Sequence, residues 1–302
     1  MSIIFMFVDG IGIAPPGEMN PFSGLTRGMR GIEELANGEQ LTTEMKPVSE
    51  PNRVLLPVDA NLGIEGLPQS GTGQTALFTG INAAKEIGKH FGPFPHSGIK
   101  PFLKRDSFFH RLKEAGRKPV FMNAYPPVFF ERAAKTRRWS CSTLMVKSSG
   151  QTLYSTEDVL EARAVTAEFF GDYWRNHLGI ELPKRNGEDI AGILLQQADK
   201  HDVVFIEYYL TDKAGHAQDL DFAKDVLRRL DEVLQHLLQS LGEHTFVLSS
   251  DHGNLEDLST KSHTRNPVPL IAIGPDAHHF SQIKSIMDVP GGIIEAVRNS
   301  ES

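Results

Sequence analysis

Residues 3–12 read IIFMFVDGIG, an unbroken apolar run that leads into Asp9 and a glycine-rich segment. Six consecutive apolar residues, 3–8, are typical of a strand that is buried on both faces, as in a parallel sheet. The two glycines favour a tight loop at the carboxyl end of this strand. The segment therefore predicts a central parallel strand that places Asp9 at the edge of the sheet.

Later segments repeat this pattern of a short apolar run preceded by an amphipathic helix. The predicted strands are 118–123, 202–209 and 245–250, and the predicted helices are 108–115, 187–200 and 222–241. A further strand is expected at 268–273, and a closing helical segment at 281–298 that Pro290 interrupts. This alternation predicts an α/β fold with a mostly parallel central sheet and helices on both faces.

Two stretches do not follow the pattern. Residues 14–57 are rich in Gly, Pro, Glu and Asn and are expected to pass over the carboxyl edge of the sheet as a long excursion. Residues 125–183 combine prolines, a basic cluster and an aromatic run, and are expected to form a small cap inserted into the core. The whole chain, 1–302, is otherwise interpreted as a single domain, because its length suits one large α/β core.

Charge and composition exclude several classes of function. The net charge of −7 disfavours nucleic acid and anionic membrane surfaces as partners. Cys141 is the only cysteine, which excludes an intrachain disulfide and fits a reducing cytoplasm. The first apolar run lacks the basic flank and cleavage site of a signal peptide, and we find no apolar run of the ~20 residues that span a bilayer. We therefore expect a soluble, cytoplasmic protein.

Polar residues follow three of the predicted strands at the point where each strand ends. Asp9 follows the first strand, Asp212 comes shortly after the third, and Asp251 and His252 directly follow the fourth. Parallel sheets bind ligands in the crevice beyond the carboxyl ends of their strands. These side chains are therefore expected to converge at one edge of the sheet.

The residue types at this edge are those that bind divalent metal ions. His263 follows His252 by eleven residues, and Asp212 and His216 are four residues apart, which places both on one side of a helical turn. Carboxylate and imidazole groups without thiolates admit several first-row metals. Each residue alone could instead cap a helix or lie on the surface, but together they predict a metal site.

The segment SGTGQTALFTG, residues 70–80, surrounds Ser70 with small residues and continues as a helix. A helix N-terminus favours an anion, so a phosphate could bind at Ser70, although a flexible Gly-Ser loop would give the same pattern. Lys261 and Arg265 flank His263 and could bind the anionic part of a substrate, because ammonium and guanidinium groups suit phosphate. The expected partner is a small phosphorylated molecule.

These motifs resemble the alkaline phosphatase superfamily, in particular cofactor-independent phosphoglycerate mutase and phosphopentomutase. The similar segments are VDG at 8–10, SGTG at 70–73, TDKAGH at 211–216, and DHGN at 251–254 with HTRNPVP at 263–269. Order, spacing and flanking residues agree, and the resemblance covers residues 1–90 and 187–295.

The resemblance implies two divalent metal ions, manganese or zinc. One would be bound by Asp212, His216 and His263, and the other by Asp9, Asp251 and His252. Ser70 would lie next to both ions, as a ligand and as the nucleophile that becomes a phosphoserine.

The identity of the nucleophile has two alternatives. Thr72 and Thr75 are rivals of Ser70, because threonine serves in some branches of the superfamily. Ser70 fits better, because its spacing to Gly73 is that of the mutases. The sequence departs from the mutases at Gln74, which stands where they have a histidine.

The length of the chain favours hydrolysis over isomerisation. The interval between Ser70 and Asp212 holds 141 residues, whereas phosphoglycerate mutases carry a second domain there. A mutase must exclude water and retain its substrate, which requires an enclosing lid. We therefore expect a phosphatase that hydrolyses a small phosphate ester. The alternatives are a compact phosphoglycerate or sugar-phosphate mutase and a metal-binding protein without catalysis.

Overall fold

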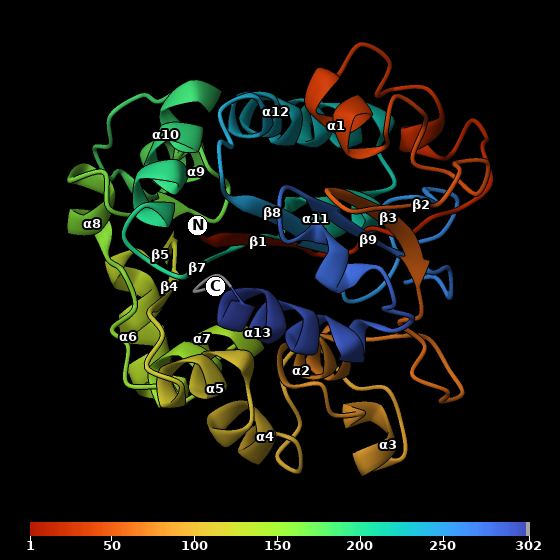
Figure 1. Cartoon of the computed structure of the whole chain (residues 1–302). Helices are drawn as coiled ribbons and strands as arrows, with labels where there is room; N and C mark the ends of the chain where they lie inside the picture. The colour runs from red at the N-terminus through yellow and green to blue at the C-terminus, as the bar shows by residue number, and fades with distance from the viewer. Residues whose placement is uncertain (300–302) are drawn as a thin grey trace.

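The computed structural model describes residues 1–299, which form a seven-stranded sheet (Figure 1). The strands lie in the spatial order β2 (Val48–Glu50), β3 (Arg53–Val58), β9 (Val268–Ile273), β8 (Thr245–Ser249), β1 (Ile3–Val8), β7 (Val203–Tyr208) and β4 (Pro119–Phe121). Strands β8, β1, β7 and β4 are mutually parallel, whereas β2, β3 and β9 add an antiparallel edge. The predicted mostly parallel α/β fold is confirmed.

Strand β1 lies inside the sheet, between β8 and β7, and all six of its residues are buried. Ile3 pairs with Val203 on one side and with Thr245 on the other, so β7 and β8 end beside β1 at the same edge. The run predicted at 118–123 divides instead: after β4 the chain forms β5 (Asn123–Ala124), which pairs with β6 (Val165–Thr166) in a separate small sheet.

Helices cover both faces of the sheet, as Figure 1 shows. On one face lie α1 (Arg30–Leu35), α10 (Gly187–Ala198) and α12 (Leu220–Gln239), and on the other α2 (Ser70–Thr79), α5 (Phe108–Glu114), α7 (Cys141–Ser148) and α13 (Val289–Asn299). Side chains alternate along β1, so that Ile4 and Met6 join the first core and Phe5 and Phe7 the second. Each face of the sheet thus packs against a separate apolar core.

The second core fixes the helix that carries Ser70. Phe78 of α2 packs edge-on against Phe7 of β1 at 5.5 Å and against Phe205 of β7 at 5.3 Å between ring centroids. Such aromatic pairs contribute about 0.5–1.5 kcal/mol beyond the burial of their area. The N-terminus of α2 is thereby held at the carboxyl edge of the sheet.

The remaining helical elements connect or flank these layers. They are η1 (Pro21–Ser23), α3 (Ala83–Ile87), α4 (Lys100–Arg105), α6 (Pro127–Thr136), α8 (Thr156–Leu160), α9 (Asp172–Leu178), α11 (Leu210–Ala217), η2 (Ala277–Phe280) and η3 (Ile286–Asp288). The interruption expected at Pro290 is wrong, because this proline lies in the first turn of α13, where its missing N–H has no intrahelical partner to lose. Within residues 1–299, we find no helix that combines the length and apolarity needed to cross a bilayer.

The expected excursion of residues 14–57 over the carboxyl edge is wrong in part. Helix α1 packs against α12 on one face of the sheet, and β2 and β3 extend the sheet beyond β9. Strand β3 was not predicted because it contains Pro57. The structure tolerates this proline because β2 pairs only with residues 53–55 of β3, which leaves that side of the strand open at Pro57.

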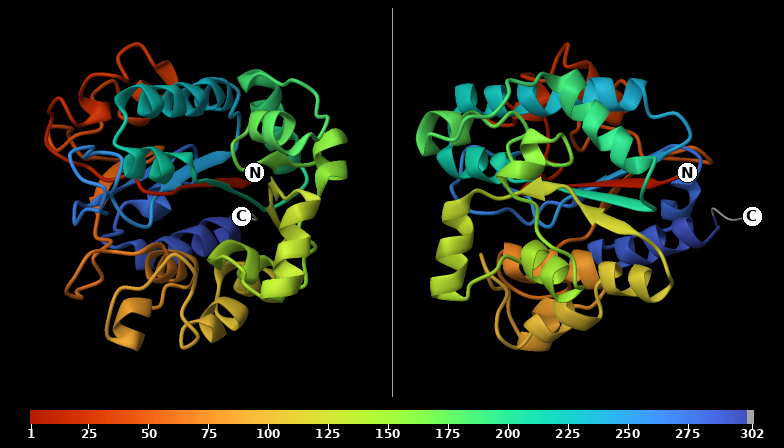
Figure 2. Two further views of the ribbon diagram at one scale, coloured as in Figure 1. Left: turned by 180° about the vertical axis from the view of Figure 1, so that it is seen from behind. Right: turned by 90° about the vertical axis from the view of Figure 1, so that its left-hand side faces the viewer.

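The predicted cap, residues 125–183, contains α6, α7, α8, β6 and α9. Helix α7 packs against α2 and α4 and contributes Cys141 and Met145 to the second core. By contrast, Val159 and Trp174 belong to a separate small cluster, and α6, yellow-green in Figure 2, stands at one side of the molecule. We therefore retain the cap as a proposal for the segments on either side of α7.

Gly31 allows α1 to lie against α12. A Cβ atom at this position would lie 2.6 Å from the backbone nitrogen of Gln235 and 2.8 Å from the carbonyl oxygen of Asp231. We expect Gly31→Ala to lower the free energy of unfolding by roughly 1–3 kcal/mol, because the helices must separate. Gly192→Ala in α10, where a Cβ would meet no atom within 4 Å, should instead raise it by about 0.5–1 kcal/mol. Equal effects in urea denaturation would contradict this packing.

Candidate metal centre and nucleophile

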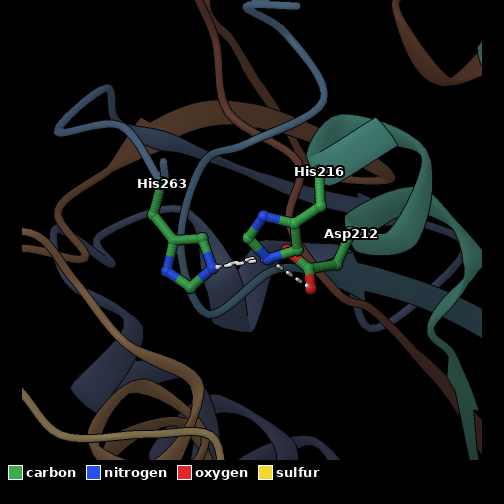
Figure 3. A group of neighbouring side chains, drawn as sticks. All are labelled: Asp212, His216 and His263. Carbon is green, nitrogen blue, oxygen red and sulfur yellow. Dashed lines mark hydrogen bonds and ion pairs between the residues drawn. The ribbon is translucent and has the colours of Figure 1, made fainter. Parts of the chain in front are cut away.

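The first group of candidate ligands comprises Asp212, His216 and His263. Helix α11 begins directly after β7 and places Asp212 and His216 on the same side, as predicted from their spacing, while His263 comes from the segment after β8 (Figure 3). His216 Nε2 lies 3.3 Å from Asp212 Oδ2, and His263 Nε2 lies 3.6 Å from Asp212 Oδ1. One ligand atom from each residue lies within 4.8 Å of the others, so the group could hold one metal ion.

Backbone carbonyls orient both imidazole rings of this group. His216 Nδ1 lies 2.7 Å from the carbonyl oxygen of Lys261, and His263 Nδ1 lies 2.7 Å from that of Pro68. Because a carbonyl oxygen only accepts hydrogen bonds, each Nδ1 carries the proton, and a neutral ring then presents a lone pair at Nε2. The two Nε2 atoms are 3.3 Å apart, so a cation between them would relieve the repulsion of the lone pairs.

The second group comprises Asp9, Asp251 and His252. Asp9 follows β1, and Asp251 and His252 follow the adjacent parallel strand β8. His252 Nε2 lies 3.5 Å from Asp9 Oδ1 and 3.5 Å from Asp251 Oδ2. One ligand atom from each residue again lies within 4.8 Å of the others. The structure thus brings together the six predicted carboxylates and imidazoles in two groups of three.

The electrostatics of the second group fit a divalent cation. Burial raises the pKa of both Asp9 and Asp251 well above the usual range, and nearby carboxylates, including that of Asp212, raise it further. Within residues 1–299, Asp9 Oδ1 and both carboxylate oxygens of Asp251 are buried without a hydrogen-bond partner. Buried, unpaired carboxylates are costly unless positive charge compensates them. The donor set therefore fits the metal ions that the resemblance implies.

Ser70 is the first residue of α2, and its hydroxyl adjoins the second group. Ser70 Oγ lies 3.0 Å from His252 Nε2. The rival hydroxyls point into the helix instead, since Thr72 Oγ1 donates to the carbonyl oxygen of Gln69 at 3.0 Å and Thr75 Oγ1 to that of Gly71 at 2.6 Å. The geometry favours Ser70 over both threonines.

Amide side chains hold the carboxylates of both groups. Gln74 donates from Nε2 to Asp9 Oδ2 at 3.3 Å, so the residue that departs from the mutase pattern still touches the site. Asn254 donates from Nδ2 to Asp212 Oδ1 at 2.6 Å. Each amide occupies one oxygen of its carboxylate and so fixes the direction of the other.

Glu256, which was not predicted from the sequence, joins the ligand-bearing loops. Its carboxylate is 1% exposed and accepts hydrogen bonds from the backbone N–H groups of Gly12 and Asn254, both at 2.8 Å. It also accepts from the Thr264 hydroxyl and from Asn266 Nδ2. These contacts join the loops after β1 and β8 to the segment that carries His263. Only its position two residues after DHGN could have indicated this.

Glu207 was missed as well, although a carboxylate inside an otherwise apolar strand was a usable signal. It lies near the end of β7 and accepts a hydrogen bond from the Ser142 hydroxyl at 2.6 Å. Burial raises the pKa of its carboxyl group. Its charge contributes to the raised pKa of Asp9, behind burial and the other carboxylates.

A pocket of about 410 Å³ opens onto the first group and Ser70. Its lining residues are Leu67, Gln69, Ser70, Pro93, Asp212, His216, Lys261, Ser262 and His263. Lys261, one of the two residues predicted to bind a substrate anion, lines this pocket. Arg265 does not line this pocket, because its guanidinium group donates to the carbonyl oxygen of Gly66.

Comparison with known proteins agrees with this fold. Residues 175–299 match the model of the Metalloenzyme superfamily. This segment contains Asp212, His216, Asp251, His252 and His263, whereas Asp9 and Ser70 precede it. Over its full length the fold is similar to that of alkaline phosphatase from the Antarctic bacterium TAB5, with a TM-score of 0.55, 13% identity, and coverage of 98% of this chain and 97% of that one. The predicted resemblance to the alkaline phosphatase superfamily is confirmed.

Curated relatives similar to part of this chain are phosphoglycerate mutases, and the similar segments span about a fifth of their length. The chain is 37% identical over 84 residues to 2,3-bisphosphoglycerate-independent phosphoglycerate mutase of Pyrobaculum aerophilum, and 38% identical over 87 residues to that of Natronomonas pharaonis. These segments cover 28% and 26% of this chain, but 20% and 17% of the relatives. A solved structure, the PH0037 protein from Pyrococcus horikoshii, has a TM-score of 0.57 at 13% identity and covers 100% of this chain and 98% of that one.

Replacing one carboxylate should separate metal binding from the stability of the metal-free protein. We expect Asp251→Asn to stabilise the metal-free protein by roughly 1–3 kcal/mol, because it removes an unpaired buried charge. The same change should abolish most of the rise in melting temperature that Mn²⁺ or Zn²⁺ gives the wild type. Thermal unfolding with and without chelator measures both, and the exposed Asp221→Asn is the control. A full metal-induced shift in Asp251→Asn would contradict its role as a ligand.

Proposed function

We propose that this protein is a metal-dependent phosphoryl-transfer enzyme that forms a phosphoserine at Ser70. The observation that carries the proposal is the position of Ser70 Oγ, 3.0 Å from His252 Nε2 and in the same pocket as Asp212, His216 and His263. A nucleophilic hydroxyl beside two groups of candidate metal ligands is the arrangement that two-metal phosphoryl transfer requires.

The reaction follows from the placement of these residues. Divalent ions bound by the two groups would lower the pKa of the Ser70 hydroxyl and neutralise charge on the phosphoryl oxygens. Ser70 Oγ attacks phosphorus, the bond from phosphorus to the ester oxygen breaks, and the leaving oxygen takes up a proton. Lys261 at the pocket wall and the N-terminus of α2 favour the bound anion. In the second half, an acceptor oxygen attacks phosphorus and releases Ser70.

For the acceptor, the comparisons favour a hydroxyl group of the same substrate, as in a phosphomutase. The two relatives described above are both named phosphoglycerate mutases. The hydrolysis expected from the length of the chain is not supported by these relatives. We therefore place transfer to a second hydroxyl first and transfer to water second.

Hydrolysis stays as a second candidate because the pocket is open. The side chain of His216 is 45% exposed, so solvent reaches the first group of ligands. A mutase with this chain would have to close the pocket while its substrate reorients. The segments on either side of α7 are the part of the fold from which such a lid could come.

Ser70→Ala tests the nucleophile. We expect transfer from a phosphate ester to fall by at least about 10³-fold, while metal content measured by elemental analysis changes little, because three other ligands remain in each group. Thr72→Val and Thr75→Val are matched controls and should retain activity within about tenfold. If Ser70→Ala were active and one of the two threonine variants inactive, that threonine would be the nucleophile instead.

Product analysis separates the two acceptors. Wild type with Mn²⁺ is incubated with phosphoglycerate or ribose phosphate and followed by phosphorus NMR. We expect an isomeric phosphate ester to form faster than inorganic phosphate, because the relatives are named phosphoglycerate mutases. Free phosphate without isomer would establish hydrolysis instead. The Ser70→Ala protein, treated identically, corrects for spontaneous or contaminating reactions.

A further inference from the structure

A second cavity, of about 420 Å³, lies in the predicted cap. Its lining residues are Ala124, Tyr125, Pro126, Val128, Phe129, Arg132, Ala167, Glu168, Tyr173, Trp174, Leu178 and Tyr209. Most of these residues are apolar or aromatic, and the volume lies in the range of pockets that enclose small organic molecules. The family match begins at residue 175, so most of this lining lies outside the matched segment.

Aromatic side chains form the walls of this cavity. Tyr125 and Phe129 stack with ring centroids 4.1 Å apart and an interplanar angle of 24°. On other parts of the lining, Tyr173 and Tyr209 are 48% and 37% exposed, and Val128 is 52% exposed. Large apolar side chains that remain exposed around one hollow mark a binding site rather than a core.

Tyr209 connects this cavity with the first group of ligands. It immediately precedes α11, and Asp212 and His216 follow it by three and seven residues. Positions i, i+3 and i+7 lie on one side of a helix. The cavity therefore begins about one helical turn from Asp212.

Glu207 connects the cavity with Asp9. Burial raises the pKa of Tyr125 well above its usual range, and the charge of Glu207 raises it further. The same carboxylate acts on Asp9, as described above. The charge of Glu207 thus acts both on the aromatic wall of the cavity and on the second group of ligands.

We propose that this cavity binds the non-reacting part of the substrate, a flat aromatic ring carried by the phosphate ester. This inference rests on the proposed phosphoryl transfer and narrows its substrate class. Tyr173 and Tyr209 offer ring faces to the substrate, and Arg132 and Glu168 offer polar contacts to substituents on its edge.

Competing esters test the ring preference. We compare 1-naphthyl phosphate with glycerol 1-phosphate, both with Mn²⁺, by following the alcohol released as Ser70 is phosphorylated, so that kcat/KM is the second-order rate constant of this first half-reaction. Wild type should prefer the naphthyl ester, and Tyr209→Ala and Tyr173→Ala should each lower the ratio of the two kcat/KM values by about tenfold. Leu160→Ala removes another exposed apolar side chain of the cap, outside the cavity, and should leave both kcat/KM values unchanged.

Binding without chemistry gives an independent readout. The chain has two tryptophans, so Trp139→Phe leaves Trp174 in the cavity wall as the only reporter. 1-Naphthol, which has no phosphate, should quench its fluorescence saturably, and an added Tyr209→Ala should weaken this binding by about tenfold.

Absence of saturable quenching, or an ester ratio that neither tyrosine variant changes, would overturn the proposal. If the protein transferred phosphate from no ester but still showed quenching that depends on Tyr209, the proposed function would be wrong. The proposal of a ring-binding cavity would then still be supported.

Discussion

The mutual repulsion of buried carboxylates is the constraint around which this structure is arranged. Asp9 and Asp251 lie at the ends of adjacent parallel strands, close to each other and to Asp212, in a setting where burial already disfavours their charge. Burying such carboxylates close together costs free energy unless positive charge or hydrogen bonds compensate them. The surrounding donors, among them Gln74 and Asn254, offset only part of the cost. Bound cations would supply the rest, so folding and metal loading are expected to be coupled.

Much of the core could be predicted because parallel strands leave a strong pattern. The run 3–8 and the later strands are recognisable by their apolar composition. The polar residues that follow these parallel strands lie at one edge of the sheet, irrespective of the conformation of the loops. The i, i+4 spacing of Asp212 and His216 likewise predicted a helical turn, and both residues lie in helix α11. These predictions need only local periodicity and the rule that the carboxyl ends of parallel strands meet at one edge of the sheet.

Other features depend on contacts that no local pattern records. Strand β3 was missed because its partner, β9, is more than 200 residues away and because it contains Pro57. Glu256 has no helical or strand periodicity to reveal it, since its role comes from hydrogen bonds with Gly12 and Thr264. Arg265 shows the opposite case: its chemistry suits phosphate, but a nearby carbonyl oxygen binds its guanidinium group.

The carbonyl groups that orient His216 and His263 belong to Lys261 and Pro68, whose neighbours Leu67 and Ser262 also border the substrate pocket. Any motion of these two loops during the entry of a ligand would rotate an imidazole. In the proposed mechanism, substrate occupancy and metal retention would therefore be linked, and the protein should lose bound ions more slowly when the pocket is full. A chelator would then inactivate the resting protein faster than the working one.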